Sequence, residues 1–179
     1  MKMLLLAVCM FLGTPDETDS KSSPKPVLTP ELSVFEPLVG KTFRGEFAAS
    51  TPEKPQFDVS KWERVLNGKA IRITHSVNDG IYGGESIVMW DSQAKVIKCW
   101  YFTTAGFCTE GQFEINGNTW SSVEKVNGNA NGITEVKATS SLAEDGTLKV
   151  SSQYLKDGKW EKGHEILYKE SPNAEVKFK

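Results

Sequence analysis

The sequence has 179 residues, enough for one ordinary domain around a single hydrophobic core. Its 21 Lys and Arg nearly balance 23 Asp and Glu, giving a formal net charge of -2, and the charges form no basic run. A chain of this kind lacks the positive patch that neutralises phosphates, so we expect no nucleic-acid partner.

The chain starts with MKMLLLAVCMFLG, a lysine followed by an apolar run from Met3 to Leu12. That run is too short to span a bilayer and has the length of a signal-peptide core, so residues 1–13 are predicted to direct export to the periplasm, the cell envelope or the medium. The stretch ending in Cys9 also resembles a lipoprotein signal, and a lipid on Cys9 would then be the membrane contact. If the segment is not a working signal, the protein is cytoplasmic.

Residues 14–28, within TPDETDSKSSPKPVLTP, are rich in Ser, Thr, Pro and charge and offer almost nothing to bury. Such a composition is typical of a solvated, disordered tether. The folded domain is therefore predicted to cover residues 29–179.

Turn signals divide the rest of the chain at intervals of roughly 8 to 15 residues. Asn-Gly and Asp-Gly pairs tolerate the positive φ of tight hairpin turns, and the segments between them alternate and are rich in β-branched and aromatic residues. We expect about ten strands. Only residues 29–37, TPELSVFEP, have a helical pattern, with Thr29 as N-cap and Pro30 in the first turn.

Consecutive strands joined by tight turns are antiparallel neighbours, and a row of about ten leaves two open edges unless it closes. The predicted fold class is therefore all-β, an antiparallel up-and-down barrel of calycin type with one short N-terminal helix. A barrel of this size has room for side chains and one small ligand.

The segment FEPLVGKTFRGEF, a short apolar helix leading into Gly-x-x-Phe-x-Gly, resembles the first strand of calycin-type barrels. It is similar to nitrobindin-like, lipocalin-related proteins and to bacterial lipocalin-like proteins of unknown function. Gly40, Phe43 and Gly45 match the nitrobindin motif in form, while Phe43 replaces its tryptophan and Phe47 its last glycine. In nitrobindins one histidine near the C-terminus binds haem, so the resemblance implies His164 as the residue that would take this role.

Polar residues on otherwise apolar strand faces are the candidates for a site. Alternation places His75 with Ile71 and Ile73, Glu85 with Ile87 and Met89, and His164 with Ile166 and Tyr168. Buried groups of this kind need hydrogen-bond partners, so His75, Glu85 and His164 are predicted either to satisfy one another in the core or to anchor a ligand.

The stretch CWYFTTAGFC, residues 99–108, is predicted to be a hairpin that turns at Thr103 to Gly106. Trp100 and Phe102 are further pocket candidates, since aromatic side chains line sites for apolar ligands as well as filling barrels. The pairing expected for this hairpin sets Cys99 opposite Glu110 and Cys108 opposite Tyr101. That offset is poor geometry for a disulfide, so both thiols are predicted to be free or only weakly coupled, although a tighter or bulged turn would bring them together.

The sequence contains no nucleophile elbow, phosphate loop, dinucleotide fingerprint or metal-ligand spacing, so we expect no structural metal site. Catalysis ranks last among the hypotheses and would depend on acid-base work by His75 and Glu85. The leading hypothesis is non-catalytic binding of a small, mainly apolar ligand inside the barrel. Two alternatives stay open: haem binding through His164, and a structural or interaction module of the cell envelope with a filled barrel.

Overall fold

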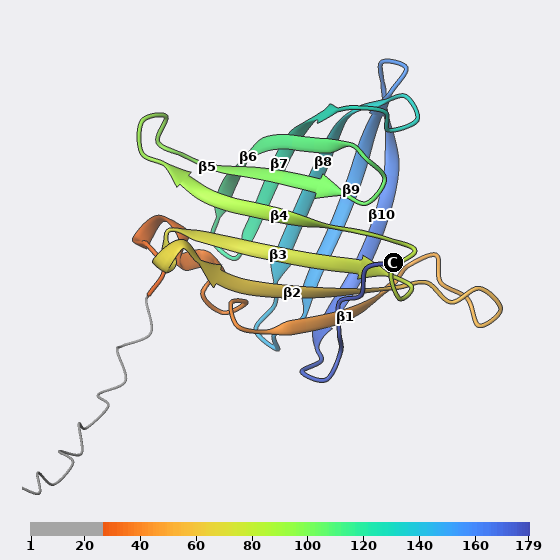
Figure 1. Cartoon of the computed structure of the whole chain (residues 1–179), viewed down its shortest axis with the longest axis horizontal. Helices are drawn as coiled ribbons and strands as arrows, with labels where there is room; N and C mark the ends of the chain where they lie inside the picture. The colour runs from red at the N-terminus through yellow and green to blue at the C-terminus, as the bar shows by residue number, and fades with distance from the viewer. Residues whose placement is uncertain (1–26) are drawn as a thin grey trace, which may run out of the picture.

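A computed structural model describes residues 27–179 of the chain, and the predicted signal peptide, Cys9 and all but the end of the predicted tether lie outside these residues. Ten antiparallel strands form a closed barrel in which each strand pairs with its sequence neighbours and β1 pairs with β10 (Figure 1). The predicted up-and-down barrel is confirmed. No helix among the described residues is long and apolar enough to cross a membrane.

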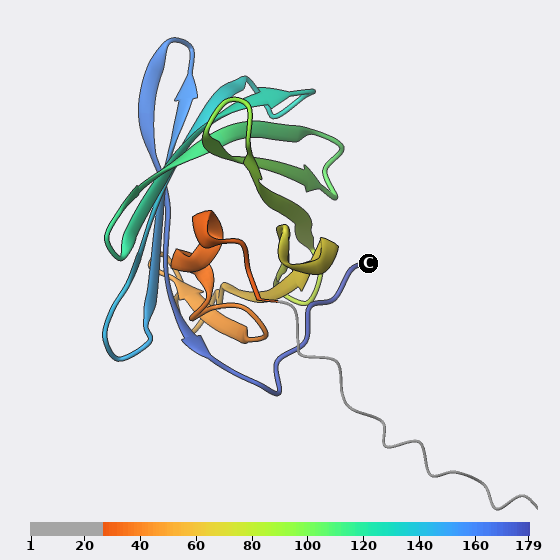
Figure 2. The same ribbon diagram turned by 90° about the vertical axis from the view of Figure 1, so that its left-hand side faces the viewer.

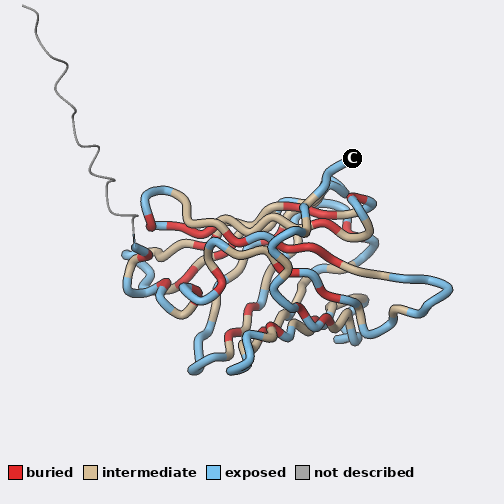
Figure 3. Tube along the Cα trace, turned by 90° about the horizontal axis from the view of Figure 1, so that it is seen from below, coloured by how far each residue is buried: buried red, intermediate tan, exposed pale blue. Residues whose placement is uncertain are grey.

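The strands follow the turn signals of the sequence. Their bounds are β1 Thr42–Phe47, β2 Phe57–Val65, β3 Ala70–Val77, β4 Tyr82–Asp91, β5 Val96–Thr103, β6 Cys108–Asn116, β7 Thr119–Asn127, β8 Ile133–Leu142, β9 Leu148–Lys156 and β10 Lys159–Glu170. The turns use positive φ at Asn78 and Asp79, at Gly106 and at Gly158, as short hairpins require. Buried positions alternate along the strands with half-buried or exposed ones, and most turns are exposed (Figure 3).

The predicted N-terminal helix is a short 3-10 helix, η1, over Pro30–Phe35, and it lies across one end of the barrel (Figure 2). Its Leu32 and Phe35, with Leu38 just beyond, are essentially inaccessible. The Phe35 ring packs against Trp62, Phe113 and Trp120, with ring centroids 6.1, 5.8 and 5.3 Å apart. This end of the interior is therefore a filled, apolar core.

Gly45 in β1 allows the barrel to close tightly. A Cβ atom there would lie 2.6 Å from the Ile166 side chain and 2.8 Å from the Leu167 carbonyl oxygen of β10. Phe43, two residues earlier, is 1 % exposed and points into the core. The glycine of the first-strand motif is thus explained by close packing between β1 and β10.

The C-terminal segment after β10 runs back along the outside of the barrel wall over β3 and β4 (Figure 1). The Lys177 backbone N–H donates to the Ser76 hydroxyl at 3.0 Å, and the Lys177 ammonium pairs with Asp79. A Cβ on Gly83 would lie 3.2 Å from the Phe178 ring. This cover explains why Ser76, on the outer face, is only 1 % exposed.

Candidate functional site

The half of the interior opposite η1 is lined by polar side chains, and we call it the polar half. It contains three hydrogen-bonded groups: Asp58 with His75, Tyr82, Tyr101 and Tyr168; His164 with Ser152 and Tyr154; and Glu124 with Thr109 and Ser122. These residues come from β2 to β7, β9 and β10, so the polar half is built by most of the barrel.

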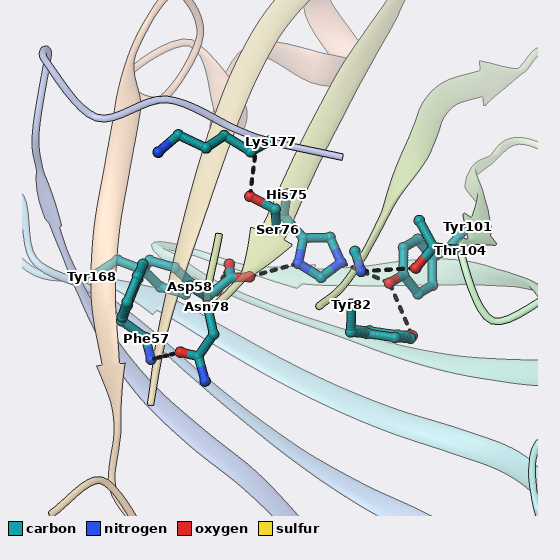
Figure 4. Close-up of polar contacts among 11 residues, drawn as sticks. Phe57, Asp58, His75, Ser76, Asn78, Tyr82, Tyr101, Thr104, Tyr168 and Lys177 are labelled. Carbon is teal, nitrogen blue, oxygen red and sulfur yellow. Dashed lines mark hydrogen bonds and ion pairs between the residues drawn. The ribbon is translucent and has the colours of Figure 1, made fainter. Parts of the chain in front are cut away.

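A chain of hydrogen bonds runs from a buried carboxylate to a tyrosine hydroxyl (Figure 4). Asp58 Oδ1 lies 2.8 Å from His75 Nδ1, and His75 Nε2 lies 2.6 Å from the Tyr101 hydroxyl. That hydroxyl lies 3.0 Å from the hydroxyl of Tyr82. We call these four residues the Asp58–Tyr82 chain.

Asp58 is the most enclosed member of the chain, at 1 % exposure. Its second oxygen, Oδ2, accepts a hydrogen bond of 2.7 Å from the hydroxyl of Tyr168 in β10. Both carboxylate oxygens therefore have a partner, as a buried charge requires.

His164 lies in β10 beside an irregularity in the pairing with β9 between Lys162 and Glu165. Its Nδ1 is 2.7 Å from the Tyr154 hydroxyl and 3.0 Å from the Ser152 hydroxyl, and its backbone N–H donates to Ser152 Oγ. The ring meets Phe47 edge-on, with centroids 5.7 Å apart. These contacts fix the orientation of the imidazole through one nitrogen.

Glu124 in β7 points into the barrel. Its Oε2 accepts from the Thr109 hydroxyl at 2.5 Å and its Oε1 from the Ser122 hydroxyl at 2.7 Å. Both donor residues, Thr109 and Ser122, are buried. The two oxygens of this carboxylate, like those of Asp58, are thus bound from within the protein.

Burial and neighbouring groups shift the pKa values of two phenols in the polar half. Burial, with smaller effects from Tyr82, Asp58 and Glu124, raises the pKa of Tyr101 well above its usual value. Burial also raises the pKa of Tyr82, with contributions from Tyr154 and Asp58. Both phenols are therefore protonated at neutral pH and can donate hydrogen bonds.

The pKa of His164 is lowered, chiefly because burial disfavours the charged ring. The charge of Asp58 raises this pKa and that of His75 lowers it. The two histidines therefore influence one another, as expected for side chains that face the same interior.

Several of these inward-facing side chains remain accessible. The His75 side chain is 23 % exposed, and Tyr82, Glu124, Tyr154 and His164 are half-buried, although strand alternation points them into the barrel. The side chains around η1 are fully buried instead. Part of the polar lining in this half of the interior is thus exposed to solvent.

The predicted cluster of His75, Glu85 and His164 is only partly correct, since the two histidines face the polar half and Glu85 does not. In the register, His75 pairs with Gly84 and Thr74 pairs with Glu85. Glu85 therefore points outward, where it lines a surface hollow of about 540 Å³ beneath the C-terminal segment. The prediction of an inward-facing Glu85 is wrong.

Trp100 and Phe102 also lie on the outer face, which corrects their prediction as pocket residues. The inward residues of β5 include Cys99 and Tyr101, so alternation turns Trp100 and Phe102 the other way. Phe102 is 53 % exposed. Neither side chain lines the polar half.

The two cysteines of the barrel are free. The pairing of β5 with β6 is shifted by one residue from the prediction, because Cys99 lies opposite Gly111 and Cys108 opposite Phe102. Cys99 is buried inside the barrel and Cys108 is half-buried on the other face. Burial and the charge of Glu124 raise the pKa of the Cys99 thiol, so it is a poor nucleophile.

Sequence reasoning missed Asp58, Glu124 and the tyrosines of the site. Asp58 alternates with Ser60 and Trp62, so an acidic residue on the face of a buried tryptophan was a usable signal. The tyrosines gave no comparable signal, because a tyrosine suits either face of a strand.

A second surface hollow, of about 720 Å³, lies on the wall formed by β5 to β8 and is lined mostly by charged and polar side chains. Within residues 27–179, no three His, Cys, Asp or Glu side chains gather as a metal site would require. The polar half gathers hydrogen-bonding groups from several strands inside the barrel.

The fold and its lining define a calycin-like barrel with a plugged end and a polar half. One similar solved structure is the crystal structure of Rv2717c from M. tuberculosis. The match has a TM-score of 0.60 and covers 80 % of this chain and 99 % of that chain. The sequence identity is 13 %, so the likeness shows a shared barrel fold. No family model matches the chain, and no curated protein matches it in sequence.

Proposed function

We propose that this protein binds a small ligand with an apolar body and a hydrogen-bonding group in the polar half of the barrel, without chemical conversion. The observation that carries the proposal is the partial exposure of inward-facing polar side chains, of which His75 is the clearest case. Side chains that serve only the core of a filled barrel are expected to be enclosed, as those around η1 are.

The ligand's apolar body would meet the Phe47 ring, which is half-buried next to His164. Its polar group would meet the hydroxyls and imidazoles. A site with an apolar wall and a few convergent polar groups is the usual form of a small-molecule site. The proposal thus keeps the mainly apolar ligand expected from the sequence and adds a hydrogen-bonding group at one end of that ligand.

The test is a titration of the full chain with acetophenone, a small aromatic ketone, followed by ligand-observed NMR. Ala138 faces inward between Ser122 and Ser152, whereas its neighbour Thr139 is exposed on the outer face. Ala138→Trp fills the polar half, and Thr139→Trp places the same side chain outside. Both variants are first checked for native near-UV circular dichroism.

We expect saturable binding by the wild type and by Thr139→Trp, and at least a tenfold loss in Ala138→Trp. Equal binding by both variants would place the probe outside the barrel and contradict the proposal. Absence of binding in all three proteins would also contradict it, and would favour the alternative of a structural or interaction module with a filled barrel.

Haem binding is the second candidate, and the contacts of His164 favour it. A histidine that ligates iron is usually oriented by a hydrogen bond at its other ring nitrogen, and Tyr154 occupies Nδ1 of His164 at 2.7 Å. Nε2 would then be the iron ligand, and haem would supply an iron able to bind small gases. The polar groups near His164, Asp58 and His75, are unlike the apolar surface that a porphyrin face prefers.

A haem titration of the full chain, with His164→Ala and His75→Ala beside the wild type, tests this candidate. It predicts a saturable Soret band in the wild type and in His75→Ala that disappears in His164→Ala. A band that persists in His164→Ala, or no band in any of the proteins, would contradict it.

A further inference from the structure

We propose that the polar half takes a ligand carrying a neutral hydrogen-bond acceptor, such as a ketone or ester carbonyl, at the Tyr82 hydroxyl, and that binding there is coupled to one proton held by the Asp58–His75 pair. This inference rests on the proposed function and specifies its ligand. It follows from counting donors and acceptors along the Asp58–Tyr82 chain.

The carboxylates of the polar half have both oxygens engaged. Asp58 accepts from His75 and Tyr168, and Glu124 accepts from Thr109 and Ser122. Asp58 is also buried, so the partly exposed groups that a ligand would meet are the hydroxyl and imidazole groups and Glu124, whose oxygens each already accept one hydrogen bond. Tyr82 is half-buried, and within the described residues the one hydrogen-bond partner of its hydroxyl is Tyr101.

Each tyrosine hydroxyl has a single proton to donate, so when Tyr101 donates to one neighbour and accepts from the other, the bonds of the chain all point the same way. If the Asp58–His75 pair holds one proton, it lies between Asp58 and Nδ1, and Nε2 must accept from Tyr101. Tyr101 then accepts from Tyr82, and Tyr82 has no proton left for a ligand. In this state the Tyr82 oxygen can only accept a hydrogen bond from a ligand.

If the pair holds two protons, Nε2–H donates to Tyr101, Tyr101 donates to Tyr82, and the Tyr82 proton is free. Only in this state can Tyr82 donate to a carbonyl oxygen and keep its hydrogen bond to Tyr101. The second proton also lies next to the buried Asp58 carboxylate, where it offsets the cost of burying that charge. Binding of an acceptor and protonation of the pair therefore favour one another, by linkage.

The other ionisable groups around the pair are those of the barrel interior. Tyr82 and Tyr101 lie on the adjoining β4 and β5, Tyr168 and His164 on β10, Tyr154 on β9 and Glu124 on β7. The polar-half groups that we identify include no lysine or arginine, and Glu124 adds a negative charge. An anionic head group is therefore disfavoured there, and a neutral acceptor is the better match.

The experiment compares acetophenone, which only accepts hydrogen bonds, with benzylammonium, which only donates them. Neither probe changes charge appreciably between about pH 5.5 and 8, a range that includes the ordinary pKa of histidine. Calorimetry in two buffers of different ionisation enthalpy measures the protons taken up or released. Tyr101→Phe interrupts the chain but keeps every charged group, and Glu85→Gln is a control on the outer wall.

For acetophenone we expect proton uptake when it binds to the wild type. The uptake should approach about one proton per bound ligand at pH values where the free Asp58–His75 pair has lost its second proton. In that range the affinity should fall by up to about tenfold per pH unit. The carbonyl stretch of the bound probe should shift to lower wavenumber. Benzylammonium should show the opposite pH dependence. In Tyr101→Phe the proton uptake should fall below half of the wild-type value, and in Glu85→Gln it should be unchanged.

Binding of acetophenone without proton uptake, or with the same uptake in Tyr101→Phe, would overturn this inference and leave the proposed function standing. Stronger binding of benzylammonium than of acetophenone at every pH would also overturn it. If neither probe binds, both the proposed function and this inference fail.

Discussion

Asp58 and Tyr168 are 110 positions apart in the sequence, yet the Tyr168 hydroxyl donates to Asp58 Oδ2 at 2.7 Å. Asp58 lies in β2 and Tyr168 in β10, the two strands that flank β1. Tyr168 is 7 % exposed and its pKa is raised, first by burial and then by the Asp58 carboxylate. The bond thus links the beginning and the end of the barrel across its inside.

Removing this donor leaves a fully buried carboxylate oxygen without a partner. We expect Tyr168→Phe to reduce the free energy of unfolding by about 1–3 kcal/mol, the usual effect of an unsatisfied buried polar group. Urea denaturation measures it. Tyr154→Phe is the matched control, because Tyr154 is only half-buried, and it should cost less than Tyr168→Phe. Equal effects of the two substitutions would contradict this account.

The plug formed by η1 should contribute strongly to stability. Phe35 is 1 % exposed and contacts three aromatic rings, so Phe35→Ala is expected to cost about 3–5 kcal/mol through lost burial and the cavity left behind. Leu167→Ala, in which a 53 % exposed side chain is shortened, should cost less than about 1 kcal/mol. Similar denaturation midpoints for the two variants would show that η1 is not packed as described.

His164 should make the protein less stable as the pH falls. Burial lowers its pKa in the folded state below the usual value of 6.5, so the unfolded chain binds the proton more readily. The free energy of unfolding should therefore decrease as the pH falls through 6.5 towards the lower folded pKa.

Urea titrations at about pH 7.5 and 5.5, on either side of the ordinary histidine pKa, measure this loss. In His164→Gln the loss between the two pH values should be smaller than in the wild type. An unchanged loss in the variant would assign the pH dependence to other groups.

The two barrel cysteines should differ in reactivity. In the folded Cys9→Ser protein, a thiol reagent should label Cys108 quickly and Cys99 slowly, because Cys99 is 4 % exposed and its pKa is raised. In urea without reductant both thiols should react. If neither reacts in urea, the cysteines form a disulfide and the described register of β5 and β6 is wrong.

Much of the fold could be predicted because the turn signals in the sequence and the need of a row of strands to pair its open edges both indicate a closed barrel. Turn pairs such as Asn116-Gly117 and Asp157-Gly158 mark hairpins, and Pro30 begins a short helix. The helix proved to be of the 3-10 type, and Thr29 makes no side-chain cap bond. The number of strands then followed from the number of turns, and a row of hairpins closes because open edges are unfavourable.

The site was harder to predict because it depends on which face of each strand points inward. In β4 the alternation of Glu85 with Ile87 and Met89 suggested a buried face, but these residues point outward, and Gly84 and Ser86 face the interior. A slip of one residue moves every side chain to the other face. Small inward residues give no hydrophobic signal, and so the alternation of β4 was assigned to the wrong face.

The entry of the chain into the barrel has a practical consequence. The Thr29 backbone N–H donates to the Gly68 carbonyl oxygen at 3.0 Å, beside the plug, whereas Tyr82 and His164 belong to the opposite half. A sensor surface coupled through residues before Val27 would hold the barrel by its plugged end and leave the other end facing the bulk solution. A label at Lys179 would instead sit next to the β3–β4 turn, close to the strand that carries His75.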